Sequence, residues 1–371
     1  MAFPLETPLT TADGGLGLKS IEVILAGQAP SGAYVASPNF PTYNFSWLRD
    51  GAYCAMAMDS VGNSDSATRF HRWAERTLLE QKDAAESLIL RLNNGELPHM
   101  DEMLPTRYTL DGALEKFGEL ENSAWPNYQL DGYGLWLAEL RRHHEKLGNT
   151  DFNAEVVDLV ARYLSATWKT NCFDCWEEFG DGQHASTVAA ISAGLNSAGI
   201  LLGEEKYIQE ANDVLDSLLA NFVRDGRFCK GFSDDRVDSS LLWIALPLGL
   251  VELDNPIFVK TVEAIRTDLR GQTGGIHRYL GDTYFGGGEW ILLTSWLGWY
   301  DRLTGNEADF ESAQQWIVDQ ATETLELPEQ SIQGTQDPEM VAPWVKRWGP
   351  VATPLLWSHA MYLLMLNEGA N

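Results

Sequence analysis

Residues 185–202 read ASTVAAISAGLNSAGILL, a stretch without any Asp, Glu, Lys or Arg. Its apolar side chains recur at spacings of three and four residues, which predicts an α-helix that is apolar nearly all round. Such a helix must be covered on every side, whereas an amphipathic helix can face water on one side. The stretch therefore predicts a helix in the interior of an α-helical protein.

The segments on either side, Phe152–Lys169 and Glu205–Arg224, have the same helical period but carry a charged face. The alternation of apolar and amphipathic segments continues along the chain, and strand signals are few. The other amphipathic segments, assigned to an outer layer, are Leu16–Leu25, Ser64–Lys82, Pro256–Arg270 and Asp309–Leu325. The other apolar segments, assigned to an inner layer, are Trp47–Ser60, Gln129–Leu140, Ser239–Glu252, Glu289–Leu303 and Pro354–Leu366.

The inner and outer segments number six each and form a quasi-repeat of helical hairpins. The inner starts, near residues 47, 129, 186, 239, 289 and 354, lie 50 to 82 residues apart, longer than the usual solenoid repeat. An open solenoid would not bury all the inner helices, whereas a closed ring covers them. We therefore expect an all-α fold, an (α/α)6 barrel of six inner and six outer helices. No linker rich in Pro, Gly or Ser interrupts the chain, which predicts a single domain over residues 1–371.

The composition of the 371 residues is that of a globular protein, with 44% hydrophobic and 21% charged residues. The 26 Lys and Arg against 53 Asp and Glu give a net charge of −27. Such a charge repels phosphate backbones and anionic lipid, so we expect no nucleic-acid and no membrane partner. No Gly-rich phosphate loop follows a predicted strand, so we also expect no cofactor. The sequence leaves the oligomeric state open.

Four cysteines are present, and the N-terminal residues show no basic segment followed by an apolar core. We therefore expect a cytoplasmic protein whose cysteines are free thiols. Cys172 and Cys175 have the spacing of a metal-ligand pair, but no second pair of Cys or His completes a four-ligand set. We therefore expect no metal site.

The loops that precede the predicted inner helices are rich in Trp, Tyr, Arg and carboxylates. In a ring these loops emerge at one end, so they should converge on one mouth. Aromatic rings stack on the apolar face of a sugar ring, and charged groups bond its hydroxyls. Each motif alone has an ordinary explanation, such as a helix start or a salt bridge, but together they favour a sugar site. They are 43–50 (YNFSWLRD), 125–132 (WPNYQLDG), 176–178 (WEE) and 327–330 (LPEQ).

Six segments, in order along the chain, resemble the glucoamylase family, glycoside hydrolase family 15. The resemblance extends from about Pro41 to Leu366. It implies an (α/α)6 catalytic domain, in agreement with the helix count. It also implies an inverting, exo-acting α-glucoside hydrolase that releases β-glucose from non-reducing ends. The matching segments are 47–50, 129–132, 176–178, 278–284, 327–330 and 354–359.

The resemblance assigns the catalytic pair. It implies that Glu177 is the general acid, that Glu329 is the general base, and that Glu178 binds sugar hydroxyls. Inversion uses two carboxyl groups about 6.5–9.5 Å apart, one protonating the leaving oxygen and one activating water. The neighbouring carboxylate of Glu178 would disfavour ionisation of Glu177 and help it to keep its proton.

The remaining matches are expected to form a glucose pocket. Arg49 and Asp50 resemble the pair that grips the terminal glucose and so enforces exo cleavage, and Tyr43 the residue under the reacting ring. His359, inside an apolar segment, is expected to be a hydrogen-bonded core histidine. The other expected substrate-binding residues are Trp47, Trp125 and Trp176 as walls, Arg278 as a sugar ligand, and Gln129, Asp131 and Trp357 in the lining or behind it.

Two departures from the family bear on the substrate. The chain has no room for a β-sandwich domain before the barrel or for a starch-binding module after it. Glu289 stands where relatives often have an uncharged residue, and it either binds a second sugar or caps the following helix. Both features favour a small α-gluco-oligosaccharide with an isomaltose-type α-1,6 linkage.

Several alternatives stay open at this point. One is an α-1,4-acting glucoamylase, and another is a trehalase on the same scaffold. A phosphorolytic enzyme would need an anion pocket, and no cluster of Lys and Arg lies near the 327–330 motif except Lys346 and Arg347. A non-catalytic sugar-binding protein would be expected to lack one carboxylate of the catalytic pair, and both are present here.

Overall fold

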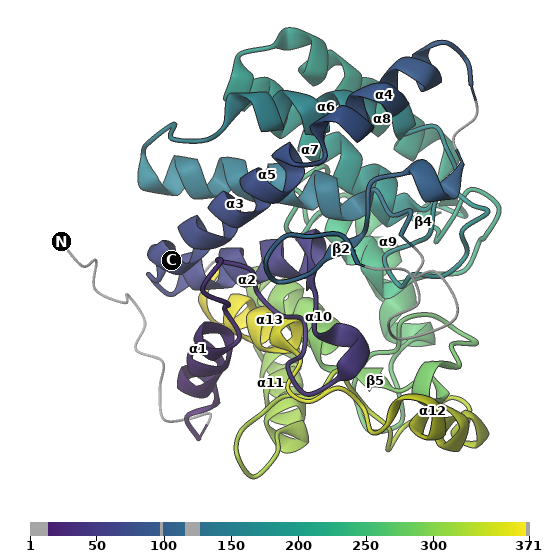
Figure 1. Ribbon diagram of the computed structural model, residues 1–371. Coiled ribbons are helices and arrows are strands. Elements are labelled where there is room, and N and C mark those ends of the chain that lie inside the picture. The colour runs from purple at the N-terminus through teal and green to yellow at the C-terminus, as the bar shows by residue number, and fades with distance from the viewer. Residues whose placement is uncertain (1–13, 97–98, 116–126, 369–371) are drawn as a thin grey trace.

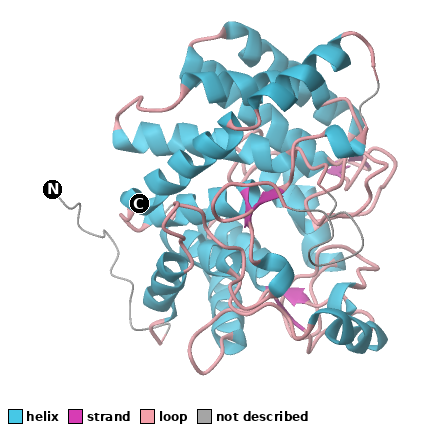
Figure 2. Cartoon of the chain, viewed as in Figure 1, coloured by secondary structure: helices cyan, strands magenta, loops and turns pink. Residues whose placement is uncertain are grey.

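Helices make up most of the protein (Figures 1 and 2). The computed structural model describes residues 14–96, 99–115 and 127–368. The α-helices are α1 (Leu16–Ala26), α2 (Leu48–Ser60), α3 (Ser64–Leu79), α4 (Lys82–Asn93), α5 (Asp131–Leu147), α6 (Ala154–Thr167), α7 (Ala185–Leu202), α8 (Glu205–Asn221), α9 (Pro256–Asp268), α10 (Ile291–Leu303), α11 (Glu307–Gln320), α12 (Val341–Trp348) and α13 (Leu356–Asn367).

Six elements form a closed inner ring. Helices α2, α5 and α7, the 3₁₀ helix η4 (Ser239–Ile244), α10 and α13 contact one another in this order, and α13 contacts α2. The residues of these elements are mostly buried, as their all-round apolar character requires. The predicted (α/α)6 architecture is confirmed.

The six predicted amphipathic segments form the outer layer. α1 packs on α13, α3 on α2, α8 on α7, α9 on η4 and α11 on α10. α6 contacts both α5 and α7. Because chain connections alternate between outer and inner elements, the N-terminal ends of the inner helices meet at one end of the ring.

The fourth inner element differs from the prediction. The sequence predicts a helix over Ser239–Glu252, but only the short 3₁₀ helix η4 forms. Pro247 has no N–H and its ring clashes with the carbonyl of a preceding helical turn, so a helix cannot continue through it. The chain leaves the helical path, and Gly249 adopts a φ of 61°. Helices α4 and α12 are additional to the predicted set.

Short strand pairs fix the loops at the N-terminal end of the ring. β1 (Ser46–Trp47) pairs with β2 (Arg107–Tyr108) directly before α2. β5 (Glu289–Trp290) pairs with β6 (Gln330–Ser331) directly before α10. A third pair joins β3 (Val223–Arg224) to β4 (Arg227–Phe228). The first two pairs place the residues around Trp47 and Glu329 by backbone hydrogen bonds.

Helix α7 crosses α5 at close range. A Cβ on Gly134 would lie 2.2 Å from the carbonyl oxygen of Ala190, so only glycine fits there. Among the described residues, α7 is the one helix long and apolar enough to cross a membrane, but 78% of it is buried inside the protein. Its apolar character is therefore accounted for by its place in the ring.

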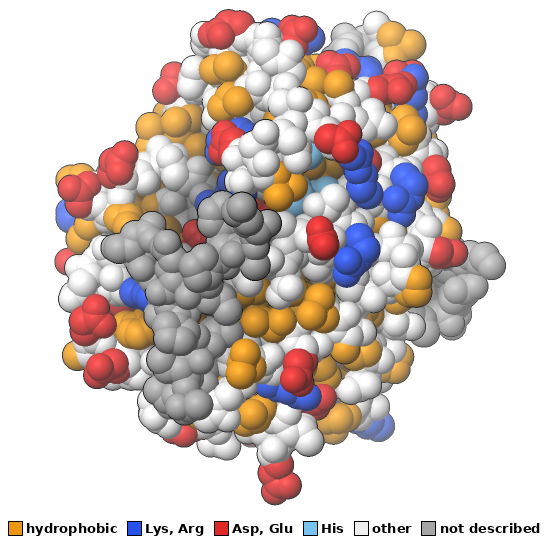
Figure 3. Space-filling view, turned by 90° about the vertical axis from the view of Figure 1, so that its left-hand side faces the viewer, with side chains coloured by type: hydrophobic (Ala, Val, Ile, Leu, Met, Phe, Trp, Pro, Cys, Tyr) orange, Lys and Arg blue, Asp and Glu red, His pale blue; other side chains and the backbone are white. Residues whose placement is uncertain are grey.

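Acidic side chains lie scattered over the face shown in Figure 3, several of them beside basic ones. This distribution is consistent with the net charge of −27. Acidic side chains that are dispersed in this way favour solubility and do not form one concentrated charged patch on this face.

Candidate active site

A cavity of about 380 Å³ opens at the N-terminal end of the inner ring. Its size is that of a pocket for a small ligand. Loops that are far apart in the sequence contribute its walls, as expected for a ring of helical hairpins. It is lined by Ala36, Phe40, Thr42, Tyr43, Trp47, Arg49, Asp50, Cys175, Trp176, Glu177, Glu178, Arg278, Tyr284, Trp290, Glu329, Trp344, Arg347, Trp348, Leu355 and Trp357.

Two carboxyl groups line the cavity from different loops, and each accepts a hydrogen bond from an aromatic side chain. The Tyr43 hydroxyl donates to Oε1 of Glu329 at 3.0 Å, and Nε1 of Trp47 donates to Oε1 of Glu177 at 2.6 Å. The rings of Tyr43 and Trp47 meet edge to face, with centroids 5.8 Å apart. The segment 43–47 therefore positions both carboxyl groups of the predicted catalytic pair.

Glu329 is 2% exposed. Burial raises its carboxyl pKa to about 7, against the opposing effects of the Tyr43 hydrogen bond and the charge of Arg278. Its Oε2 is buried and has no hydrogen-bond partner among the described side chains. A carboxylate with a free oxygen and a pKa near neutrality can take a proton from water.

The loop that carries Glu329 is held by helix α13. Nε2 of His359 accepts the backbone N–H of Leu327 at 2.9 Å, and its Nδ1 lies 2.8 Å from Oγ of Ser20. Ser358 Oγ donates to the carbonyl of Pro328 at 2.8 Å. Burial lowers the pKa of His359 to about 3, so the ring is neutral. The expectation of a hydrogen-bonded core histidine is confirmed.

Glu177 adopts a left-handed backbone conformation, with φ at 68°. This region is sparsely populated by residues other than glycine, and it persists only where surrounding contacts enforce it. Burial raises the pKa of its carboxyl, while Arg49 acts in the opposite sense from 3.6 Å. A raised pKa favours the protonated form that a general acid needs.

Arg49 and Asp50 lie in the first turn of α2 and line the cavity. Nη1 of Arg49 donates to Oε1 of Gln129 at 2.7 Å and to Oδ2 of Asp131 at 3.0 Å. Gln129 and Asp131 therefore hold Arg49 from behind and are not among the cavity lining. Burial raises the Asp50 pKa to about 7, and its Oδ2 has no hydrogen-bond partner within the described structure, although Nε of Arg49 lies 3.6 Å away.

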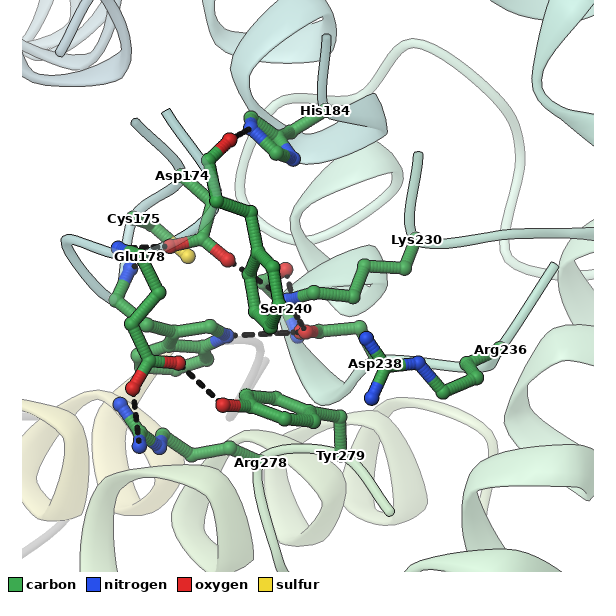
Figure 4. Close-up of polar contacts among 12 residues, drawn as sticks. Asp174, Cys175, Glu178, His184, Lys230, Arg236, Asp238, Ser240, Arg278 and Tyr279 are labelled. Atoms are coloured by element: carbon green, nitrogen blue, oxygen red, sulfur yellow. Dashed lines mark hydrogen bonds and ion pairs between the residues drawn. The ribbon is translucent and has the colours of Figure 1, made fainter. Parts of the chain in front are cut away.

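Arg278 and Glu178 both line the cavity, and their side chains meet in an ion pair (Figure 4). Asp282 binds the Arg278 guanidinium through two hydrogen bonds, from Nε at 2.7 Å and from Nη2 at 2.5 Å. Glu178 accepts from Nη2 of Arg278 at 3.4 Å and from the hydroxyl of Tyr279. The guanidinium also lies 5.4 Å from the ring of Trp176. Arg278 is thus fixed with little freedom to reorient.

Aromatic side chains form most of the remaining wall. Trp47, Trp176 and Trp357 were predicted from the sequence and do line the cavity. The predicted site residues leave out several other lining residues, most of them aromatic. The signal that could have found them is an aromatic residue in a loop at the mouth of the ring. In particular, the Tyr284 hydroxyl lies 2.8 Å from the Tyr43 hydroxyl. The others are Phe40, Trp290, Trp344, Arg347 and Trp348, the last three on α12.

The prediction that Glu289 binds substrate is wrong. Its side chain is fully buried, and it is not part of the cavity lining. It accepts hydrogen bonds from N and Oγ1 of Thr273 and from N of Gly275. The carboxylate therefore holds the 271–275 loop, and it carries no information about substrate. Trp125, another predicted wall residue, lies outside the described residues.

The cysteines do not form a metal centre in the described part of the chain. All four are buried free thiols. No group of three or more His, Cys, Asp or Glu side chains that could hold a metal ion occurs within residues 14–96, 99–115 and 127–368. Cys175 lines the cavity, where burial raises the pKa of its thiol.

Comparison with known proteins finds relatives that match nearly the whole chain. The family model of the glycosyl hydrolases family 15 matches residues 16–327. An isomaltose glucohydrolase of Kribbella flavida is 37% identical over 361 residues, 95% of this chain and 92% of the relative. A solved glycosidase in complex with glucose superimposes with a TM-score of 0.89 at 36% identity and covers 96% of both chains. Trehalase 2 of Sulfolobus acidocaldarius is more distant, with 25% identity over 81% of this chain and 55% of the relative.

The match over most of the chain, the closed ring of helical hairpins and the carboxyl pair in the cavity lead to one conclusion. The chain is a glycoside hydrolase and belongs to family 15 of the glycosyl hydrolases.

Proposed function

We propose that the protein is an inverting, exo-acting α-glucosidase that releases β-glucose from isomaltose and similar short α-1,6-linked oligosaccharides. The observation that carries this proposal is a single cavity in which Glu177 and Glu329 stand on separate loops among aromatic walls. The 37% identity to an isomaltose glucohydrolase over nearly the whole of both chains supports the choice of substrate.

The catalytic roles follow from the environments of the two carboxyl groups. Glu177 gives its proton to the glycosidic oxygen as the bond to the anomeric carbon breaks. Glu329 takes a proton from the water that attacks the opposite face of that carbon, through the oxygen that has no partner in the described structure. Attack by water without a covalent intermediate inverts the configuration at the anomeric carbon.

Exo cleavage is inferred from an adjacent pair of charged residues in the cavity wall. Arg49 and Asp50 offer a guanidinium and a carboxylate that can bond the hydroxyls of a terminal glucose. Gln129 and Asp131 fix Arg49 from behind, so that the ligand meets a pre-organised donor.

The proposal is tested by steady-state kinetics on isomaltose, maltose, trehalose and soluble starch. We expect the highest kcat/KM for isomaltose. Glu177→Gln and Glu329→Gln should each lower kcat on isomaltose by about 10²–10⁴-fold, because each removes a proton transfer. The exposed Glu311→Gln, on α11, serves as the matched control and should not change kcat.

Each possible failure affects a different part of the proposal. A higher kcat/KM for maltose, starch or trehalose would overturn the substrate and leave the catalytic pair in place. Full activity of either active-site variant would overturn the assignment of that carboxyl group.

A further inference from the structure

Behind the cavity, Lys230 is buried with two carboxylates, and it is absent from the cavity lining. The lysine is 4% exposed, Asp174 is 1% exposed and Asp238 is fully buried. Nζ of Lys230 lies 2.8 Å from Oδ2 of Asp174 and 2.5 Å from Oδ2 of Asp238. Figure 4 shows the ammonium group between the two carboxylates, which come from different segments of the chain. A buried charge must be paired, so these three groups depend on one another.

Asp174 shapes the loop of the general acid. Its Oδ1 accepts the backbone N–H groups of Trp176 and Glu178, both at 2.9 Å. Its backbone carbonyl also accepts the N–H of Glu177 at 2.9 Å. The residue between the two N–H groups held by Oδ1 is Glu177, whose φ is 68°. These contacts enforce a backbone conformation that Glu177 would otherwise seldom adopt.

Asp238 holds the same loop through the side chain of Trp176. Nε1 of Trp176 donates to Asp238 Oδ1 and Oδ2 at 3.1 and 3.0 Å. Asp238 also accepts from N and Oγ of Ser240, at the start of η4. The loop is thus anchored to the inner ring through Asp238. Lys230 is the cation that pairs with both anchoring carboxylates at this depth.

Lys230 also contacts the neighbours of the sugar-binding carboxylate. Its Nζ lies 4.3 Å from the ring centroid of Tyr279, whose hydroxyl donates to Glu178. It lies 5.0 Å from the ring centroid of Phe179, the residue that follows Glu178. The same ammonium group therefore faces the loop 174–179 from behind.

We propose that Lys230 is a positioning residue for catalysis: through Asp174 and Asp238 it holds Glu177 where its proton reaches the glycosidic oxygen. The inference rests on the proposed role of Glu177 as general acid. Loss of the ammonium leaves two unbalanced carboxylates, and the loop that they hold relaxes from its strained conformation. A shift of about 1 Å in a reacting group can cost about 10²-fold in rate.

The test compares two substrates with different needs for the acid. Cleavage of isomaltose expels a sugar oxygen, which must receive a proton as the bond to carbon breaks. Cleavage of α-glucosyl fluoride expels fluoride, which leaves with far less help from an acid. A misplaced Glu177 should therefore slow the first reaction much more than the second.

We expect Lys230→Met to lower kcat on isomaltose by about 10²-fold, with kcat on α-glucosyl fluoride reduced by less than about tenfold. KM should rise on both substrates, because Trp176 and Glu178 line the cavity from the same loop, so the ratio of the two kcat values isolates the effect on Glu177. Lys206→Met, which removes an exposed lysine that pairs with Asp158 and Glu204, is the matched control. Circular dichroism and the thermal midpoint check the fold of each variant.

A second variant tests the same proposal if Lys230→Met does not fold. The double variant Lys230→Met with Asp238→Asn removes one of the two unbalanced charges, and the same preference for the fluoride is expected. Equal losses on both substrates, or unchanged kcat on isomaltose, would overturn the proposal. Glu177→Gln is measured alongside: if it does not favour the fluoride either, the role of Glu177 itself fails, and this failure is distinguishable from that of Lys230.

Discussion

Replacing Tyr43 by Phe should move the acid side of the pH profile to higher pH. The Tyr43 hydroxyl donates to Oε1 of Glu329 at 3.0 Å and stabilises its ionised form. The pKa of Glu329 is already raised to about 7 by burial. Removing the donor raises it further, and the base must be ionised to accept a proton from water. The acid limb of kcat/KM should therefore shift upward.

The size of the shift follows from the strength of the lost bond. A hydrogen bond to a charged group contributes about 1.5–3 kcal/mol, and each pKa unit corresponds to about 1.36 kcal/mol. The expected shift is therefore about one to two pH units above the wild-type limb. The pKa of Asp50 is also raised to about 7, but burial, Arg49 and Glu177 set it. Replacing Tyr43 should therefore leave the pKa of Asp50 unchanged.

The assay is kcat/KM for isomaltose between about pH 4 and 9, which reports the ionisations of the free enzyme. Tyr207→Phe is the matched control, since Tyr207 donates to the carboxylate of Asp158 at 2.6 Å, on the outer helix α8. Its profile should match that of the wild type. An acid limb in Tyr43→Phe that stays in place, or moves to lower pH, would refute the reasoning and assign the limb to another group.

Three further outcomes are expected. His359 has its pKa lowered to about 3 by burial, so the unfolded chain binds more protons between this value and about 6.5, and stability falls as pH falls. Urea unfolding from pH 7 to 4.5 should show the wild type losing about 2–3 kcal/mol more than His359→Gln, and equal losses would contradict this. Glu289→Gln should lower the unfolding free energy by about 1–3 kcal/mol with KM for isomaltose unchanged, because the carboxylate holds a loop; a raised KM with unchanged stability would speak against this. Gly134→Ala places a Cβ 2.2 Å from the Ala190 carbonyl oxygen and should cost about 1–3 kcal/mol, so an unchanged thermal midpoint would disprove the close contact.

The sequence predicts the ring because helices that are buried on all sides must be apolar on all faces, and this composition is visible in the sequence. Segments such as 185–202 must be covered whatever the details of packing, and the position of each motif before an inner segment places it at one end of the ring. The apolar pattern of residues 239–252 predicts one helix, whereas Pro247 within this segment argues against it. The loss of helix after Ile244 shows that backbone chemistry outweighs hydrophobic pattern at that point.

The parts of the site that the sequence does not predict depend on tertiary contacts between distant loops. Glu289 is directed into the loop 271–275 by a chain reversal that no local pattern specifies. Lys230 belongs to no motif, and its place becomes visible only when Asp174, which is 56 positions away, lies against it. Tyr284 ends the matching segment 278–284, but its contact with Tyr43 joins residues 241 positions apart.

The central claim is that water, activated by Glu329 and not preceded by a covalent intermediate, displaces the leaving group protonated by Glu177. The most direct measurement is proton NMR of the anomeric signals during the first minutes of isomaltose hydrolysis, before mutarotation mixes the two anomers. The proposed mechanism predicts that β-glucose is the new anomer released from the non-reducing end. Release of α-glucose would mean retention through a nucleophile and would contradict the assignment of Glu329 as a base.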